Sequence, residues 1–171
     1  MRSGRLWILI SFLASGLFVS QVALAPLPNV QIVSLLFIIY AFIIPMPALM
    51  LVAILFSLLQ MLFWGMGDWV LGYLWIWPVW VMFIYLFKRY NADSAERWAG
   101  LNALWGVIFG FLFAVHHGVL YGFHTMFAYY LRGISFDIIH MVSNYILTFF
   151  MFTPLFKVIN KLAYKYQGDR S

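Results

Sequence analysis

The sequence LWILISFLASGLFVSQVALAPLPNVQIVSLLFIIYAFIIPMPALMLVAILFSLLQMLFWGMG (residues 6–67) contains no acidic and no basic side chain. One helix needs about 20 predominantly apolar residues to cross a bilayer, so this run is long enough for three crossings. Prolines divide it at residues 26–29 and 45–47, because proline ends helices and restricts the residue before it. The run therefore predicts spans at about residues 6–25, 30–44 and 48–66, of which the middle one is short for a full crossing.

The composition of the whole chain agrees with a lipid environment. Hydrophobic residues make up 65% of the 171 residues and charged residues only 9%, whereas soluble domains are about 25% charged. We therefore predict an all-α integral membrane protein with a single domain, residues 1–171. The chain has no cysteine, which excludes disulfides, thiolate metal sites and thiol nucleophiles.

The N-terminus imitates a secretory signal, with Arg2, Arg5, an apolar run and an A-x-A pattern at residues 23–25. The run has the length of a full span, and further apolar segments follow it instead of a secreted domain. We expect it to be retained as the first helix.

The second half of the chain predicts spans at about residues 69–87, 98–122 and 135–160. A hydrophilic loop at residues 88–97 and an aromatic-rich loop before residue 135 separate them. With six spans and an inner N-terminus, Arg132 alone of the ten lysines and arginines lies outside, as the positive-inside rule favours. We therefore expect six transmembrane helices with both termini cytoplasmic. The net charge of +5 then reports topology, and no nucleic-acid partner is expected.

All four histidines fall between His116 and His140. Polar groups within a membrane are costly and mark functional sites by default. On helices, His117 and His124 share a face with Tyr121, and His140 shares one with Asp137 and Asn144. The expected topology puts this segment on the outer side with the Pro26–Asn29 turn, a pattern typical of a pocket open to the outside. The alternative is that these groups bond to one another between helices or lie at the wet interface.

Trp69, Tyr73 and Trp77 recur every four residues near the same side. Such a face fits either a wall that stacks on a flat ring or an interfacial aromatic belt. The chain has no H-E-x-x-H, P-loop or G-x-S-x-G motif. We therefore expect no enzyme activity and no cofactor, and active transport would need a partner or a gradient.

Several short motifs resemble the S-components of energy-coupling factor (ECF) transporters. Leu27-Pro28-Asn29-Val30-Gln31 is similar to the family's proline–asparagine first loop. Tyr73–Pro78 resembles a fourth-helix stretch in one branch of the family, and Gly133–His140 resembles part of the sixth helix of that branch, as do Ser143-Asn144 and Pro154–Lys157. The resemblance covers nearly the whole chain.

The resemblance implies a substrate-binding membrane subunit in the bacterial plasma membrane. Such a subunit captures a vitamin or related micronutrient from outside and docks on an ECF module of one transmembrane coupling subunit and two ATPases. The ligand site that it implies comprises Asn29, Trp69, Tyr73, Trp77, His116, His117, Asp137, His140 and Asn144. The family's first-helix A-x-x-x-A docking motif is replaced here by small-residue spacings at Ser11, Ser15, Gly16 and Ser20, which still allow close helix approach.

The aromatic residues and the few hydrogen-bonding groups fit a flat polar heteroaromatic. The first expectation is a vitamin B6-type compound, followed by a thiamin-related pyrimidine or a cobalamin-related fragment. The histidines keep open histidine-based transition-metal uptake or a membrane metalloenzyme, although the nickel and cobalt members of the family are expected to begin with Met-His and this chain begins Met1-Arg2. A structural subunit with no ligand is the third alternative. Asp137→Ala and Trp77→Ala are expected to weaken binding without loss of expression.

Overall fold

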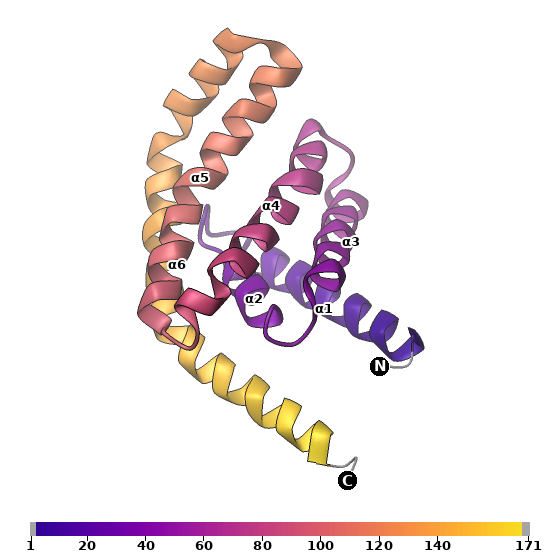
Figure 1. Ribbon diagram of the computed structural model, residues 1–171. Coiled ribbons are helices and arrows are strands. Elements are labelled where there is room, and N and C mark those ends of the chain that lie inside the picture. The colour runs from indigo at the N-terminus through magenta and orange to yellow at the C-terminus, as the bar shows by residue number, and fades with distance from the viewer. Residues whose placement is uncertain (1–2, 169–171) are drawn as a thin grey trace.

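The computed structural model describes residues 3–168, except for the side chains of residues 3, 160 and 162–168 (Figure 1). Within that range the chain is helical and contains no strand. The helices are α1 (Ser3–Leu24), α2 (Val33–Tyr40), α3 (Met46–Trp64), α4 (Asp68–Asn91), α5 (Ala95–Tyr121) and α6 (Phe123–Gly168).

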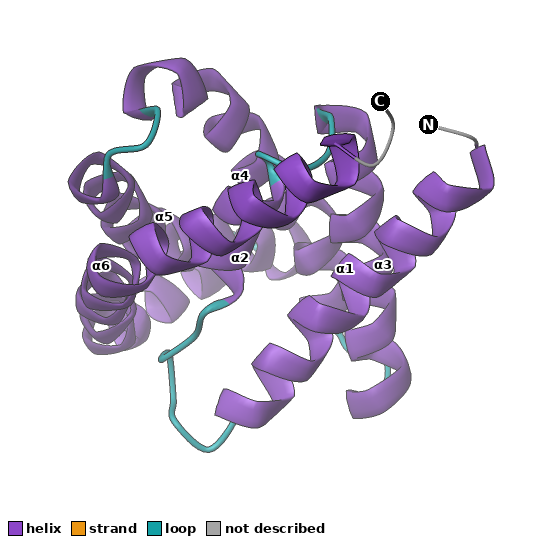
Figure 2. Ribbon diagram, turned by 90° about the horizontal axis from the view of Figure 1, so that it is seen from below, coloured by secondary structure: helices purple, strands orange, loops and turns teal. Residues whose placement is uncertain are grey.

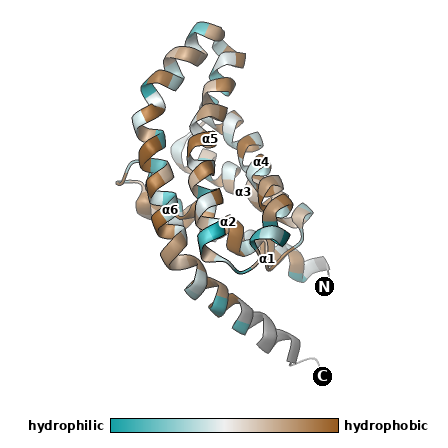
Figure 3. Ribbon diagram, turned by 60° about the vertical axis from the view of Figure 1, so that its left-hand side comes forward, coloured by the Kyte–Doolittle hydropathy of each residue, from teal (hydrophilic) through white to brown (hydrophobic). Residues whose placement is uncertain are grey.

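In the described part of the chain, 5 helices are long and apolar enough to cross a membrane, namely all except α2. Their outward-facing residues are apolar as well as their buried ones: Ile8, Leu62 and Leu86 are more than two-thirds exposed. Figure 3 shows apolar residues along the whole length of these helices. A helix bundle with an apolar exterior requires lipid around it, so the chain is a multi-pass membrane protein.

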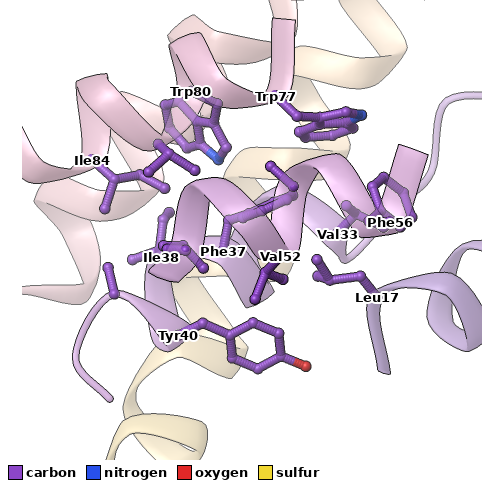
Figure 4. Packing of buried hydrophobic residues seen from close by; sticks show 14 of the residues in the cluster. Leu17, Val33, Phe37, Ile38, Tyr40, Val52, Phe56, Trp77, Trp80 and Ile84 are labelled. Atoms are coloured by element: carbon purple, nitrogen blue, oxygen red, sulfur yellow. The ribbon is translucent and has the colours of Figure 1, made fainter. Parts of the chain in front are cut away.

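The second predicted span is a short helix inside the bundle. Helix α2 has 8 residues, which gives a length of about 12 Å against a hydrocarbon core of about 30 Å. Nearly all of its side chains are buried, and Phe37 and Ile38 are completely enclosed. Figure 4 shows Leu17 of α1, Val52 of α3 and Trp80 of α4 gathered around it. Helix α2 is thus the centre of the core, and by its own length it does not cross the membrane.

Side chains of α4 satisfy the end of this short helix. Lys88 Nζ donates to the carbonyl of Ala41, the C-cap residue of α2, at 2.7 Å, and the Tyr85 hydroxyl donates to the same carbonyl at 3.4 Å. The ammonium group also lies 4.9 Å from the centre of the Phe42 ring. Because the last carbonyls of a helix have no partner within it and carry partial negative charge, a buried helix end needs such donors. Lys88 and Tyr85 therefore allow α2 to end inside the protein.

The expected loop between residues 122 and 135 is helical. Helix α5 ends at Gly122, whose φ is +90°, and α6 begins at the next residue. The prediction that the last helix starts at about residue 135 is therefore wrong. Residues 123–134 contain no proline and are mostly aromatic or long apolar residues, which a helix accommodates when it packs against a neighbour. Here the neighbour is α5, and the two helices form a long hairpin (Figure 1).

Glycines on α5 bring the two helices of this hairpin into close contact. A Cβ added at Gly106 would lie 2.7 Å from the backbone nitrogen of Met141. One turn further along α5, a Cβ at Gly110 would collide with the Asp137 carboxylate. This G-x-x-x-G spacing permits direct contact between helix backbones in membranes. It also fixes the positions of Asp137 and His140 relative to α5.

Candidate ligand-binding site

Two adjoining pockets lie where the α1–α2 connection meets the α5–α6 hairpin. The smaller has a volume of about 130 Å³ and the larger about 550 Å³. Pro28, Asn29, Phe109 and His140 line both. Figure 2 shows the α1–α2 connection extending beside α6, so segments far apart in the sequence form this site. The combined space is of the size that small-molecule sites have.

The α1–α2 connection is held against α6 by polar contacts. The Ser143 hydroxyl donates to the Asn29 carbonyl at 2.9 Å, and Gln31 Nε2 lies 2.7 Å from His140 Nε2. Asn29 has a φ of +57°, a left-handed conformation that asparagine tolerates better than most residues. The tight bend at Asn29 and these contacts place the connection across both pockets.

His140 lies at the junction of the two pockets and is 3% exposed. Its ring meets Phe109 of α5 edge to face, with centroids 5.3 Å apart. The ring Nε2 faces the Gln31 amide nitrogen, and because an amide nitrogen only donates, this contact is a hydrogen bond in the His140 tautomer whose proton is on Nδ1. His140 therefore joins α6 to the α1–α2 connection at the point where a ligand in either pocket would lie.

A chain of buried polar side chains continues from His140 into the bundle along α6. Asn144 Oδ1 accepts a hydrogen bond from Ser34 at 3.3 Å, and its Nδ2 donates to the Asn102 carbonyl at 3.1 Å. Asn102 Nδ2 in turn donates to the Thr148 hydroxyl at 2.7 Å. Asn144 lines neither pocket, and its bonds join α2, α5 and α6. Its position supports a packing role below the site, because buried polar groups must find partners.

Asp137 and Arg132 both line the larger pocket. The carboxylate lies over Gly110, where any larger residue on α5 would displace it. Asp137 is half-buried and Arg132 is exposed. Among the described residues, the only ion pair is between His117 and Asp68, so the Asp137 carboxylate is not neutralised by Arg132. It is directed to a pocket instead of to a protein partner.

The three aromatic residues of α4 have different positions. Tyr73 lines the smaller pocket. Trp69 packs edge to face on Tyr73, with centroids 5.4 Å apart, and lines neither pocket. Trp77 is completely buried and stacks on Phe37 of α2 at 5.2 Å. Trp77 is therefore a core residue, and its replacement by alanine is expected to destabilise the fold instead of leaving expression intact.

The histidines at the end of α5 contact the start of α4 instead of the pockets. His116 Nε2 lies 3.0 Å from the Asp68 carbonyl, and Trp75 Nε1 donates to His116 Nδ1 at 3.4 Å. His117 Nδ1 lies 3.7 Å from the Asp68 carboxylate. The His117 ring stacks on Tyr129 at 4.2 Å. These two histidines therefore join α4, α5 and α6 and are not among the pocket residues, while His124 is exposed on the first turn of α6.

No group of three or more His, Cys, Asp or Glu side chains within residues 3–168 is arranged to hold a metal ion. The four histidines are separated by the contacts just described. The polar side chains that line the pockets are amides, the hydroxyls of one threonine and three tyrosines, one imidazole, one carboxylate and one guanidinium.

The predicted docking residues of α1 do not share one surface. Ser11 and Ser15 are exposed on the outer side of the helix. Gly16 faces the core, where an added Cβ would lie 2.9 Å from the Tyr40 hydroxyl. Ser20 is half-buried and its hydroxyl donates to the Leu17 carbonyl. Only Ser11 and Ser15 are therefore available to a partner, and the small size of Gly16 serves the contact with α2.

Sequence reasoning missed several residues that line the pockets. Gln21 and Gln31 line the smaller one, while Phe113 and Tyr129 line the larger one. Phe109 lines both. The G-x-x-x-G spacing at Gly106 and Gly110 was the available signal, because it marks the face of α5 that meets α6 and Phe109 lies between the two glycines.

In comparisons with known protein families, curated proteins and solved structures, no match to this chain is found.

Proposed function

We propose that this chain is the substrate-binding S-component of an ECF-type importer in a bacterial plasma membrane. In this role it captures a vitamin or related micronutrient, and a vitamin B6-type heteroaromatic is the first candidate. An ATP-driven partner module of one transmembrane coupling subunit and two ATPases completes uptake. The observation that supports the proposal most directly is the pair of pockets around His140, which lies within a bundle of membrane-spanning length.

The shape of the site favours binding over catalysis. Aromatic side chains from α5 and α6 line the larger pocket, and a few polar groups converge on it: Asn29, Arg132, Asp137 and His140. This combination of flat apolar walls and few polar contacts is typical of small-molecule binding sites. Below the pockets, both polar atoms of the Asn144 side chain are paired with protein groups, and so is Nδ2 of Asn102. The pockets therefore end against packed protein, as expected of a binding site that does not continue through the bundle.

We also propose six passes through the membrane region, with both termini cytoplasmic and α2 as a short buried segment. The positive-inside rule supports this orientation, since Lys88, Arg89 and Arg97 flank the α4–α5 connection. That connection and the α2–α3 connection lie at one end of the bundle in Figure 1, opposite the α3–α4 connection and the α5–α6 turn. The pockets would then open to the outside.

Because the chain has no cysteine, single cysteines report this orientation without background. Met66, in the α3–α4 connection, and Asp93, in the α4–α5 connection, are both exposed. We expect a membrane-impermeant maleimide to label Met66→Cys in intact cells and Asp93→Cys only after permeabilisation. Labelling of Asp93→Cys in intact cells would reverse the proposed orientation.

The central experiment is purification of the chain with whatever binds it. We expect co-purification with an ATPase-containing module and tight binding of one small molecule, identified by mass spectrometry. Ligand binding should also raise the thermal stability of the purified protein. Transport by the chain alone, chemical turnover of the ligand, or a stoichiometric transition metal would contradict the proposal.

The larger pocket can be filled from its wall without disturbing the core. Ala128 lines this pocket and is exposed. We expect Ala128→Trp to weaken ligand binding by about tenfold or more, because the indole occupies space that the ligand needs, with little change in thermal stability. Isothermal titration with the co-purified ligand measures the effect. Ala23→Trp, at an exposed alanine of α1 outside both pockets, is the matched control and should bind normally.

A further inference from the structure

The buried side-chain polar atoms of the pocket residues that lack a hydrogen-bond partner in the described part of the chain are acceptors. Within residues 3–168, the side-chain oxygens of Gln21 and Gln31 are buried and make no hydrogen bond. Both residues line the smaller pocket. The Asp137 carboxylate lines the larger one and forms no ion pair in the described part of the chain. These three acceptors favour a ligand that brings donors, while Arg132 in the larger pocket supplies donors for acceptor groups on the same ligand.

Asp137 is the strongest of these acceptors. An ionised carboxylate only accepts hydrogen bonds, and its bonds are stronger when the surroundings are apolar and the partner is charged. Here the neighbouring pocket residues include Phe109, Phe113 and Phe136. Gly110 gives the carboxylate its position, because no side chain separates α5 from it. A half-buried carboxylate beside aromatic rings is well suited to a protonated or amino-bearing group.

Gln31 provides a second acceptor next to His140. Its amide nitrogen is engaged with the His140 ring at 2.7 Å, which leaves the oxygen without a partner. A buried acceptor with no hydrogen bond is destabilising because it has lost its water, and a donor on the ligand would remove that cost. The oxygen is covered by neighbouring side chains, so a donor reaches it after a rotation of the terminal amide. His140 lies at the boundary of the two pockets, so a ligand beside it has access to both Gln31 and Asp137.

The walls between these acceptors are flat. Phe109 lines both pockets, and Phe113, Tyr129 and Phe136 line the larger one. Aromatic side chains offer stacking and edge contacts to a ring, and they attract cationic groups over their faces. An aliphatic amine would use the acceptors but not the walls. A planar ring with donors uses both.

We propose that the ligand is a flat heteroaromatic compound bearing N–H donors, as an amino or aminomethyl group on the ring or as a protonated ring nitrogen, which Asp137 and the Gln31 oxygen accept. This inference rests on the proposed function as a binding subunit and narrows its substrate class. Among the candidate micronutrients, it favours aminopyrimidines and the amine form of vitamin B6 over ring compounds that only accept hydrogen bonds.

Matched probe pairs test the donor requirement directly. One pair is an aminopyrimidine and the corresponding methylpyrimidine. The other is pyridoxamine and the analogue in which a methyl group replaces the aminomethyl group. We expect the purified protein to bind the amino member of at least one pair about tenfold more tightly or better, as measured by titration calorimetry. Equal affinity for the amino and methyl members of both pairs would overturn the inference.

Variants assign the preference to the two acceptors. Asp137→Asn preserves the shape of the side chain. We expect it to lower the ratio of the affinities for the amino and methyl compounds by about tenfold. Gln31→Glu keeps an acceptor and should retain the preference, whereas Gln31→Leu should reduce it. Asp93→Asn removes the same charge from the exposed α4–α5 connection and should change nothing. An unchanged preference in both Asp137→Asn and Gln31→Leu would overturn the assignment.

Binding measurements with a broad vitamin panel distinguish a failure of the donor inference from a failure of the proposed function. If a vitamin without N–H donors binds, and Ala128→Trp abolishes its binding, the chain is a binding subunit and the donor inference is wrong. If no compound of a broad vitamin panel binds, the proposed function fails and the donor inference fails with it.

Discussion

Trp77→Ala is expected to lower the free energy of unfolding by about 3–5 kcal/mol, because it empties a large volume at the centre of the core. Trp77 is completely buried. It stacks on Phe37 at 5.2 Å and meets Phe56 edge to face at 5.7 Å. Its removal would leave a cavity beside α2 that the surrounding helices cannot close without moving (Figure 4). Unfolding of the detergent-solubilised protein in increasing denaturing detergent measures the loss.

Two further variants distinguish a packing role for Trp77 from a ligand contact. Trp64→Ala removes a tryptophan that is 55% exposed and should change stability by no more than about 0.5 kcal/mol. Trp77→Phe keeps most of the buried volume and removes an indole N–H that has no partner in the described structure, so it should fold and bind ligand. A stable Trp77→Ala protein with weakened binding would instead assign Trp77 to the ligand wall, as its spacing with Tyr73 predicts.

Gly106→Ala and Gly100→Ala are expected to have opposite effects although both lie in α5. An added methyl group at Gly106 would come within 2.9 Å of backbone atoms of His140 and Met141 on α6. Backbone cannot rotate away as a side chain can, so α5 and α6 must separate, at a cost of about 1–3 kcal/mol. At Gly100 nothing lies within 4 Å of the added methyl group. Alanine there should stabilise the helix by up to about 1 kcal/mol.

Thermal unfolding of the two alanine variants in the same detergent compares them directly. Because His140 lies at the Gly106 contact, Gly106→Ala should also weaken ligand binding, whereas Gly100→Ala should not. Equal stability of the two variants would show that the close approach of α5 and α6 is not maintained in the membrane protein.

The helix boundaries were predictable where proline, glycine or charge interrupts the apolar sequence. The predicted span at about 48–66 corresponds to α3 (Met46–Trp64), and that at about 69–87 to α4 (Asp68–Asn91). The start of α6 was not predictable in this way. Arg132 and Gly133 are residues typical of a loop, but packing against α5 makes the segment helical. The chain reverses direction earlier, at Gly122. Tertiary contact there overrides the local signal.

Hydropathy also does not predict the position of α2 at the centre of the bundle. Its residues are as apolar as those of a spanning helix, and only its shortness between two proline breaks indicated a different place. The donors that allow it to end inside, Lys88 and Tyr85, come from a helix more than 40 residues away in the sequence. A sequence pattern around α2 does not indicate such distant hydrogen-bond donors, so they could not be predicted.

The candidate site shows the same division. Asn29, Tyr73, Asp137 and His140 were predicted from topology and resemblance, and they line the pockets. His116, His117 and Asn144 were predicted by the same reasoning but are bonded to other helices instead. A polar residue on a membrane helix signals that it needs a partner, and the sequence does not tell whether that partner is a ligand or a neighbouring helix.

The shortness of α2 has a consequence for hydration. Since α2 begins only at Val33, the stretch from Ala25 to Ile32 descends beside α6 without helical structure (Figures 1 and 2). Non-helical backbone at membrane depth is tolerated only where protein covers it or water reaches it. Pro28 and Asn29 of this stretch are exposed and line both pockets, so water that enters the pockets would reach this peptide backbone. A ligand that fills them expels this water and must replace some of its hydrogen bonds, so its affinity depends on the desolvation of the main chain as well as on its contacts with side chains.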